Sequence, residues 1–110
     1  MIHNFRIVVI GLGTQGKKRR ESSGKEFVFG IDPIHSEAHY RSIFEVPINL
    51  YDAAFVCTPE SEKIPIIKYL IDNDKHVLCE KPLMTSSIDE LKSLENSACK
   101  KRIVLYTAYN

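Results

Sequence analysis

An apolar run followed at once by three glycines constrains the fold of this chain more than any other feature. Residues 5–10 read FRIVVI, and GLGTQG follows directly, with glycines at positions 11, 13 and 16. This G-x-G-x-x-G spacing after a buried strand is typical of the turn that leads from the first strand of a parallel sheet into its first helix. A lone match also occurs in ordinary glycine-containing turns, so the rest of the chain has to supply the context.

Four further apolar runs supply part of that context, because each suits a strand buried on both faces. They lie at residues 27–31, 53–57, 76–79 and 103–109. Two helix-like segments, SEKIPIIKYLIDND and SSIDELKSLENSACKK, separate the last three runs. Strands that alternate with helices favour a parallel sheet with right-handed crossovers. We therefore predict an α/β fold, a doubly wound parallel sheet with the first strand at its centre.

Composition and charge narrow the classes of partner. A net charge of +1 on 110 residues gives no overall basic field, so neither nucleic acid nor an anionic membrane is the expected partner. The basic run KKRR at residues 17–20 is interpreted as a solvated helix face. The chain has no apolar run near the roughly 18 residues that a membrane span needs. We expect a single soluble domain over residues 1–110 in the cytoplasm.

The cysteines and histidines indicate no metal or disulfide framework. Cys57, Cys79 and Cys99 are odd in number, widely spaced and without a C-x-x-C pair, which favours reduced core residues. Cys79 is expected in the core rather than as a nucleophile. His35 and His39 lie four residues apart but lack a third ligand nearby, so surface positions are expected and no metal site is predicted.

The glycine loop and the acid that follows the second strand together favour a dinucleotide. Gly11 would permit the tight turn, Gly13 would let the backbone approach a pyrophosphate, and Gly16 would let helix and strand pack closely. Asp32 would accept hydrogen bonds from an adenosine ribose. Because an acid repels a 2′-phosphate and Pro33 is not basic, NAD is favoured over NADP.

Several motifs in this order resemble the N-terminal domain of the glucose-fructose oxidoreductase and inositol dehydrogenase (Gfo/Idh/MocA) family. They are VVIGLGTQG, GID, AAFVCTP, HVLCEKPL and the final YTAYN, and they span nearly the whole chain. The resemblance implies a Rossmann fold and an oxidoreductase that moves a hydride between a nicotinamide and a hydroxyl-bearing carbon of a sugar, polyol or nucleotide-linked sugar. It assigns Lys81 as the catalytic residue and Glu80 to the nicotinamide ribose. The expected cofactor-binding residues are Gly11, Leu12, Gly13, Thr14, Gln15, Gly16, Asp32, Pro33, Cys57, Thr58, Pro59, Glu80, Lys81 and Asn110.

The sequence also departs from the family pattern. Glu60 and Lys63 replace an asparagine and a histidine that commonly follow the Thr-Pro pair, so the contacts of those two residues are in doubt. We expect the second, substrate-binding domain of the family to be missing from this chain, and we expect the chain alone to bind a dinucleotide without turning over a substrate. A homo-oligomer is expected from the surface that such a domain would cover. A non-catalytic dinucleotide-sensing module is the alternative, and a DNA-binding protein is disfavoured by the neutral charge.

Overall fold

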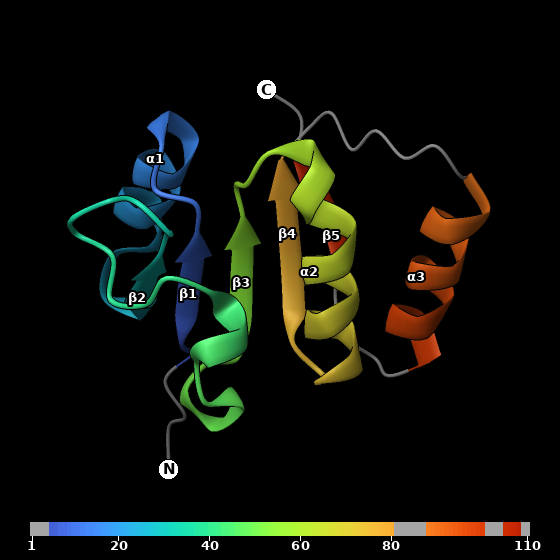
Figure 1. The fold of residues 1–110 in the computed structure, drawn as a ribbon. Coiled ribbons are helices and arrows are strands. Elements are labelled where there is room, and N and C mark those ends of the chain that lie inside the picture. The colour runs from blue at the N-terminus through green and yellow to red at the C-terminus, as the bar shows by residue number, and fades with distance from the viewer. Residues whose placement is uncertain (1–4, 81–87, 101–104, 109–110) are drawn as a thin grey trace, which may run out of the picture.

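The computed structural model describes residues 5–80, 88–100 and 105–108, which form a parallel sheet with helices on both faces (Figure 1). Neighbouring strands of this sheet are all parallel, in the order β2-β1-β3-β4-β5. The predicted doubly wound α/β fold is therefore confirmed. The strands in the described part of the chain are β1 (Ile7–Ile10), β2 (Phe27–Ile31), β3 (Ala53–Val56), β4 (His76–Glu80) and β5 (Leu105–Ala108).

The position predicted for the first strand is wrong. β1 lies inside the sheet between β2 and β3, but β3 is the middle strand of the order. The reason is that the chain crosses back over β1 after β2 and then adds β3, β4 and β5 on that side. The segment beyond β2 contributes a single bridge, between Ile31 and Tyr40. A further strand on that side of β2 would have placed β1 nearer the middle of the sheet.

The helices are α1 (Thr14–Ser23), α2 (Glu60–Asp72) and α3 (Ile88–Lys100). In Figure 1, α2 lies in front of the right-hand strands of the sheet. Alternate residues of β1 face opposite layers, as the period of two in a strand requires. A Cβ added to Gly16 of α1 would lie 3.6 Å from Val9 Cγ1, so α1 covers the face that Val9 occupies.

The main core lies on the other face, between the sheet and the pair α2 and α3. Burial of such aliphatic side chains is the principal stabilising term of the fold. Val8 and Ile10 of β1 belong to it, next to residues of β3 and β4. The helices contribute Ile66, Ile67, Leu70, Ile71, Leu94 and Ala98.

α1 has almost no apolar side chains, and its basic residues contact the protein instead. The Arg19 guanidinium carbon lies 5.8 Å from the centre of the Phe55 ring, a distance at which cation and ring attract each other. Arg20 Nη1 lies 2.9 Å from Glu37 Oε2. The long side chains of this helix thus partly replace the missing apolar stripe.

The connection from β2 to β3 is built from two short 3-10 helices, Ile43–Glu45 and Ile48–Leu50. Ser42 caps the first one: its Oγ accepts from the Phe44 N–H at 3.2 Å, and its own N–H donates to Glu45 Oε1 at 3.1 Å. Pro47 separates the two 3-10 helices, because a proline disfavours helical backbone in the residue before it.

Burial of the cysteines follows the sequence expectation in part. Cys79 is fully buried in β4, as predicted, and Cys57 is half-buried at the end of β3. Cys99 is exposed, so a core position is wrong for it, because α3 turns this residue away from the sheet. In the described part of the chain no helix has the length and apolar character that crossing a bilayer requires.

Candidate functional site

The glycine loop after β1 packs directly against the end of β3. Gly11 has φ +92°, a value that favours glycine, and its N–H donates to the Ile31 carbonyl at 2.7 Å. A Cβ at Gly11 would lie 2.7 Å from the Cys57 carbonyl oxygen, which is closer than real Cβ atoms come. The tight turn predicted at Gly11 is present, and it brings the carboxyl ends of β1, β2 and β3 together.

The other two glycines of the loop have different reasons to be glycine. A Cβ at Gly16 would lie 1.7 Å from the Gly11 carbonyl oxygen, so the close approach of helix and turn requires Gly16. Gly13 precedes α1 with φ −72° and is exposed, and a Cβ there would have no atom of the described chain within 4 Å. The fold therefore accounts for Gly11 and Gly16 but not for Gly13.

Asp32 follows β2, and its carboxylate is held by backbone N–H groups. Oδ2 accepts from the Leu12 N–H at 2.8 Å, and Oδ1 accepts from the N–H groups of Ile34 and His35 at 2.9 and 3.0 Å. Partial burial alone would raise the pKa of Asp32, but these hydrogen bonds and the nearby His35 together lower that pKa below its ordinary value. The carboxylate is therefore ionised at neutral pH and fixed beside the glycine loop.

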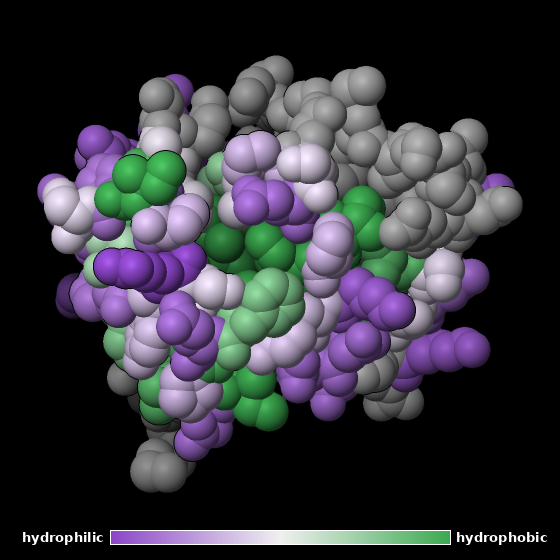
Figure 2. Space-filling model, viewed as in Figure 1, coloured by the Kyte–Doolittle hydropathy of each residue, from purple (hydrophilic) through white to green (hydrophobic). Residues whose placement is uncertain are grey.

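A pocket of about 240 Å³ opens at these strand ends. Figure 2 looks onto this face, where hydrophobic side chains lie in a hollow between hydrophilic ones. Its floor is apolar and its rim is polar, which is the usual character of a small-molecule site. The floor includes Ile10, Ile31, Ile43 and Ile66, and the polar lining residues are Arg41, Ser42, Thr58 and Glu62.

Thr58 is the lining residue whose environment most clearly calls for a ligand. Its hydroxyl oxygen is buried and has no hydrogen-bond partner in the part of the chain that the structure describes. A buried hydroxyl without a partner costs free energy, so such groups usually meet a bound molecule or an ordered water. Thr58 also borders Gly11, because a Cβ at Gly11 would lie 3.2 Å from the Thr58 nitrogen.

Several predicted site residues are placed only by their position along the chain. Pro59 precedes α2 and is exposed, and Cys57 donates its N–H to the Ile10 carbonyl at 2.8 Å. Glu80 is the last residue of β4, so it ends at the same edge of the sheet as the crevice. Lys81 and Asn110 lie outside the described residues, as do the side chains of Thr14, Gln15 and Glu80.

The departures from the family pattern fall on the first turn of α2. Lys63 is buried, with 4% of its surface exposed, although lysine is rarely buried in proteins. The Glu60 side chain lies outside the described part of the structure.

His35 and His39 each form a hydrogen bond with nearby backbone. The Nδ1 atom of His35 accepts from the Glu37 N–H, and the Nδ1 atom of His39 accepts from the Gly30 N–H, both at 3.1 Å. The described residues contain no group of three side chains placed to hold a metal ion.

Sequence reasoning missed the residues that the connection from β2 to β3 brings to the pocket. Arg41 and the turn that follows it line the pocket together with Pro33. The predicted site residues include none between Pro33 and Cys57, because this part of the sequence shows no clear periodicity. The Ser42-x-x-Glu45 capping pattern was the available signal, because it marks a turn whose start is fixed.

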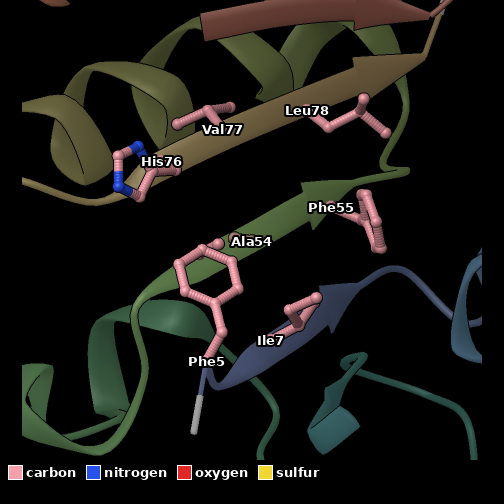
Figure 3. A pocket seen from close by; sticks show the side chains of 8 residues that line it. Phe5, Ile7, Ala54, Phe55, His76, Val77 and Leu78 are labelled. Carbon is pink, nitrogen blue, oxygen red and sulfur yellow. The ribbon is translucent and has the colours of Figure 1, made fainter. Parts of the chain in front are cut away.

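A second hollow of about 490 Å³ lies on the opposite face of the sheet (Figure 3). The labelled side chains stand in front of β1, β3 and β4, with α2 behind the strands. Phe55 and Leu78 are half-buried and Phe5 is 38% exposed. The lining of this hollow is almost wholly apolar, and His76 is the main polar exception.

Solved structures of dehydrogenases share this fold. The UDP-N-acetylglucosamine 3-dehydrogenase of Acidithiobacillus ferrooxidans superimposes with a TM-score of 0.82 at 23% identity, covering 97% of this chain and 38% of that one. The dehydrogenase MviM of Clostridium difficile gives 0.79 at 22% identity, covering 96% and 39%. The D-galactose-1-dehydrogenase of Rhizobium etli gives 0.75 at 18% identity, covering 96% and 37%. The chain therefore spans less than two fifths of these proteins.

No curated protein sequence matches the chain. The model of the oxidoreductase family with an NAD-binding Rossmann fold (Gfo/Idh/MocA) does match, over residues 18–109. The match begins after the glycine loop, so the loop geometry is an independent observation. Fold, family model and sequence motifs agree, and the chain belongs to the Gfo/Idh/MocA oxidoreductase family with its NAD-binding Rossmann fold.

Proposed function

We propose that residues 1–110 are a dinucleotide-binding domain whose crevice at the ends of β1, β2 and β3 holds NAD(H). The observation that carries the proposal is Gly13, because the fold leaves open space beside this glycine while Gly11 and Gly16 are explained by packing. A backbone without a Cβ lets a pyrophosphate approach the first N–H groups of α1, where the helix dipole favours negative charge. Thr58 adds a buried hydroxyl that needs a partner at the same pocket.

NAD is the preferred cofactor in this proposal. Asp32 is held ionised at the end of β2, and its two oxygens retain acceptor capacity beyond the three backbone N–H groups they already bind. Ribose hydroxyls would donate to this carboxylate, whereas a 2′-phosphate would be repelled by it. Pro33, the next residue, supplies no positive charge.

The proposed reaction is hydride transfer between the nicotinamide and a hydroxyl-bearing carbon of a sugar, polyol or nucleotide-linked sugar. When bound, the nicotinamide supplies the hydride chemistry, and the protein positions the reactants. Lys81 is proposed to move the proton of the substrate hydroxyl, because it follows the last residue of β4 at the crevice edge of the sheet. Support for a sugar comes from the names of solved relatives, which include a UDP-N-acetylglucosamine 3-dehydrogenase and a D-galactose-1-dehydrogenase.

The proposal for this chain alone is narrower. The chain spans less than two fifths of the dehydrogenases that share its fold, so we propose that it binds the cofactor without appreciable turnover. We also propose that the chain self-associates through the apolar hollow on the face opposite α2, because half-buried Phe55 and Leu78 would gain burial in a second copy. The cytoplasmic location stays a prediction.

The test is a calorimetric titration of the 110-residue chain with NADH and NADPH, followed by incubation with NAD and a panel of sugars and polyols. We expect NADH to bind more tightly than NADPH, and NADH absorbance to remain flat with every substrate. Failure of both dinucleotides to bind would refute the proposed function. Turnover that Lys81→Ala abolishes would show instead that these residues suffice for catalysis. NADH binding without turnover is also what a redox-sensing module predicts. Light scattering tests the proposed self-association.

A further inference from the structure

The connection between β2 and β3 brings a positively charged residue to the pocket at the end of β2, the strand that Asp32 follows in the chain. Arg41 lines the 240 Å³ pocket together with Thr58 and with Pro33, the residue next to Asp32. Eight residues separate Asp32 from Arg41, so the sequence alone does not reveal that Arg41 lies at a pocket next to the end of β2. The residues that directly follow β2 include an acid but no arginine or lysine before Arg41.

The backbone around Arg41 is fixed on both sides. Before it, Tyr40 pairs with Ile31, and the Tyr40 carbonyl accepts from the Asp32 N–H at 3.0 Å. After it, Ser42 is held by the reciprocal hydrogen bonds with Phe44 and Glu45 described above. The starting point of the Arg41 side chain is therefore tied to the position of Asp32, although the side chain itself is exposed.

The charges around the pocket favour opposite forms of the cofactor. Asp32 and Glu62 are acidic, and both disfavour an added phosphate. Arg41 is the basic residue among those that line the pocket in the described chain. A guanidinium binds phosphate oxygens through a planar pair of N–H groups and also stacks on aromatic rings, so it suits an adenosine that carries a 2′-phosphate.

We propose that Arg41 is a specificity-determining residue of this crevice, which binds the 2′-phosphate of NADP(H) and so offsets the repulsion from Asp32. The inference rests on the proposed function, because it assumes that the crevice holds the adenosine end of a dinucleotide. Asp32 then sets the preference for NAD, and Arg41 sets how large that preference is. Removal of the acid exposes the contribution of the base.

The experiment is a set of calorimetric titrations with NADH and NADPH on four forms of the chain: the natural sequence, Arg41→Gln, Asp32→Asn, and the double variant. Asn at position 32 removes the charge and keeps one of the two oxygens that accept from backbone N–H groups. Arg41→Gln should weaken NADPH binding about tenfold and NADH binding less than threefold, the size expected for one charge-assisted contact. Asp32→Asn should tighten NADPH binding about tenfold, and most of that gain should be lost in the double variant.

Lys68→Gln is the control for the loss of one positive charge, because Lys68 is exposed on α2 and does not line this pocket. It should leave the ratio of the two affinities unchanged. If Arg41→Gln binds NADH and has the same ratio of NADH affinity to NADPH affinity as the natural sequence, this inference is overturned and the proposed function is left intact. Equal weakening of both cofactors would overturn it as well, because Arg41 would then act on the shared part of the ligand. Absence of NADH binding to the natural chain would refute the proposed function and this inference with it.

Discussion

Replacing Gly11 with alanine should destabilise the domain more than the same replacement at another glycine with a positive φ. The positive φ of +92° at Gly11 costs an L-residue about 1–3 kcal/mol. The new Cβ would also lie 2.7 Å from the Cys57 carbonyl oxygen, which β1 holds in place through the Cys57 N–H and the Ile10 carbonyl at 2.8 Å. Moving this backbone adds about 1–3 kcal/mol, as overpacking does. Reduced freedom of the unfolded chain returns about 0.4–1 kcal/mol, so the net loss is about 1–6 kcal/mol.

Gly24→Ala is the matched control, because Gly24 also has a positive φ, of +56°, but a Cβ there would meet nothing within 4 Å in the described chain. Its expected loss is about 0–2 kcal/mol. Urea unfolding at 25 °C measures both variants, and the slope of the free energy with urea should stay the same. An equal loss in the two variants would refute the reasoning, because it would mean that the contact with Cys57 contributes nothing.

Two further variants test other parts of the structure. Asp32→Asn should make the stability of the domain depend less on pH in the acid range. Because the pKa of Asp32 is lowered by folding, its carboxylate stabilises the fold at pH values above its ordinary pKa near 3.9, and this stabilisation is lost as the pH falls through and below that value. The urea midpoint should therefore fall less between pH 6 and pH 3 in the variant than in the natural chain, and parallel curves would contradict this. Lys75→Met should cost about 1–3 kcal/mol, because the Lys75 ammonium donates to the carbonyls of Ile48 and Tyr51, whereas Lys68→Met, on an exposed surface, should change the unfolding free energy by less than about 0.5 kcal/mol in the same assay.

The elements of the fold are largely predictable from the sequence because the apolar runs and the helical periodicity are strong local signals. Residues 27–31 form a strand with the predicted bounds, and α2 begins one residue before the predicted segment. Strand order is less accessible, because it depends on whether the chain beyond β2 adds a strand or returns across β1. Nothing local in residues 33–52 decides this, and a turn fixed by Ser42 and Glu45 occupies the space instead.

The site is predictable where a motif fixes the backbone and unpredictable where tertiary contacts bring in a side chain. Gly11, Gly16 and Asp32 lie where the G-x-G-x-x-G spacing and the acid after the second strand place them. Arg41 reaches the crevice only because Tyr40 pairs with Ile31, a contact without a sequence signature. The buried hydroxyl of Thr58 depends in the same way on how closely β3 approaches the glycine loop.

The affinity of the chain for NADH in Gly13→Ala and Gly24→Ala tests the central claim most directly. Gly13 has φ −72° with open space beside it, so its alanine variant should keep or gain about 0.4–1 kcal/mol of stability. The same methyl group should block the pyrophosphate and weaken NADH binding at least tenfold, whereas Gly24→Ala should lose stability and bind NADH as tightly as the natural chain. NADH binding to Gly13→Ala with unchanged affinity would contradict the account, because the open space beside this glycine would then not be where the dinucleotide lies.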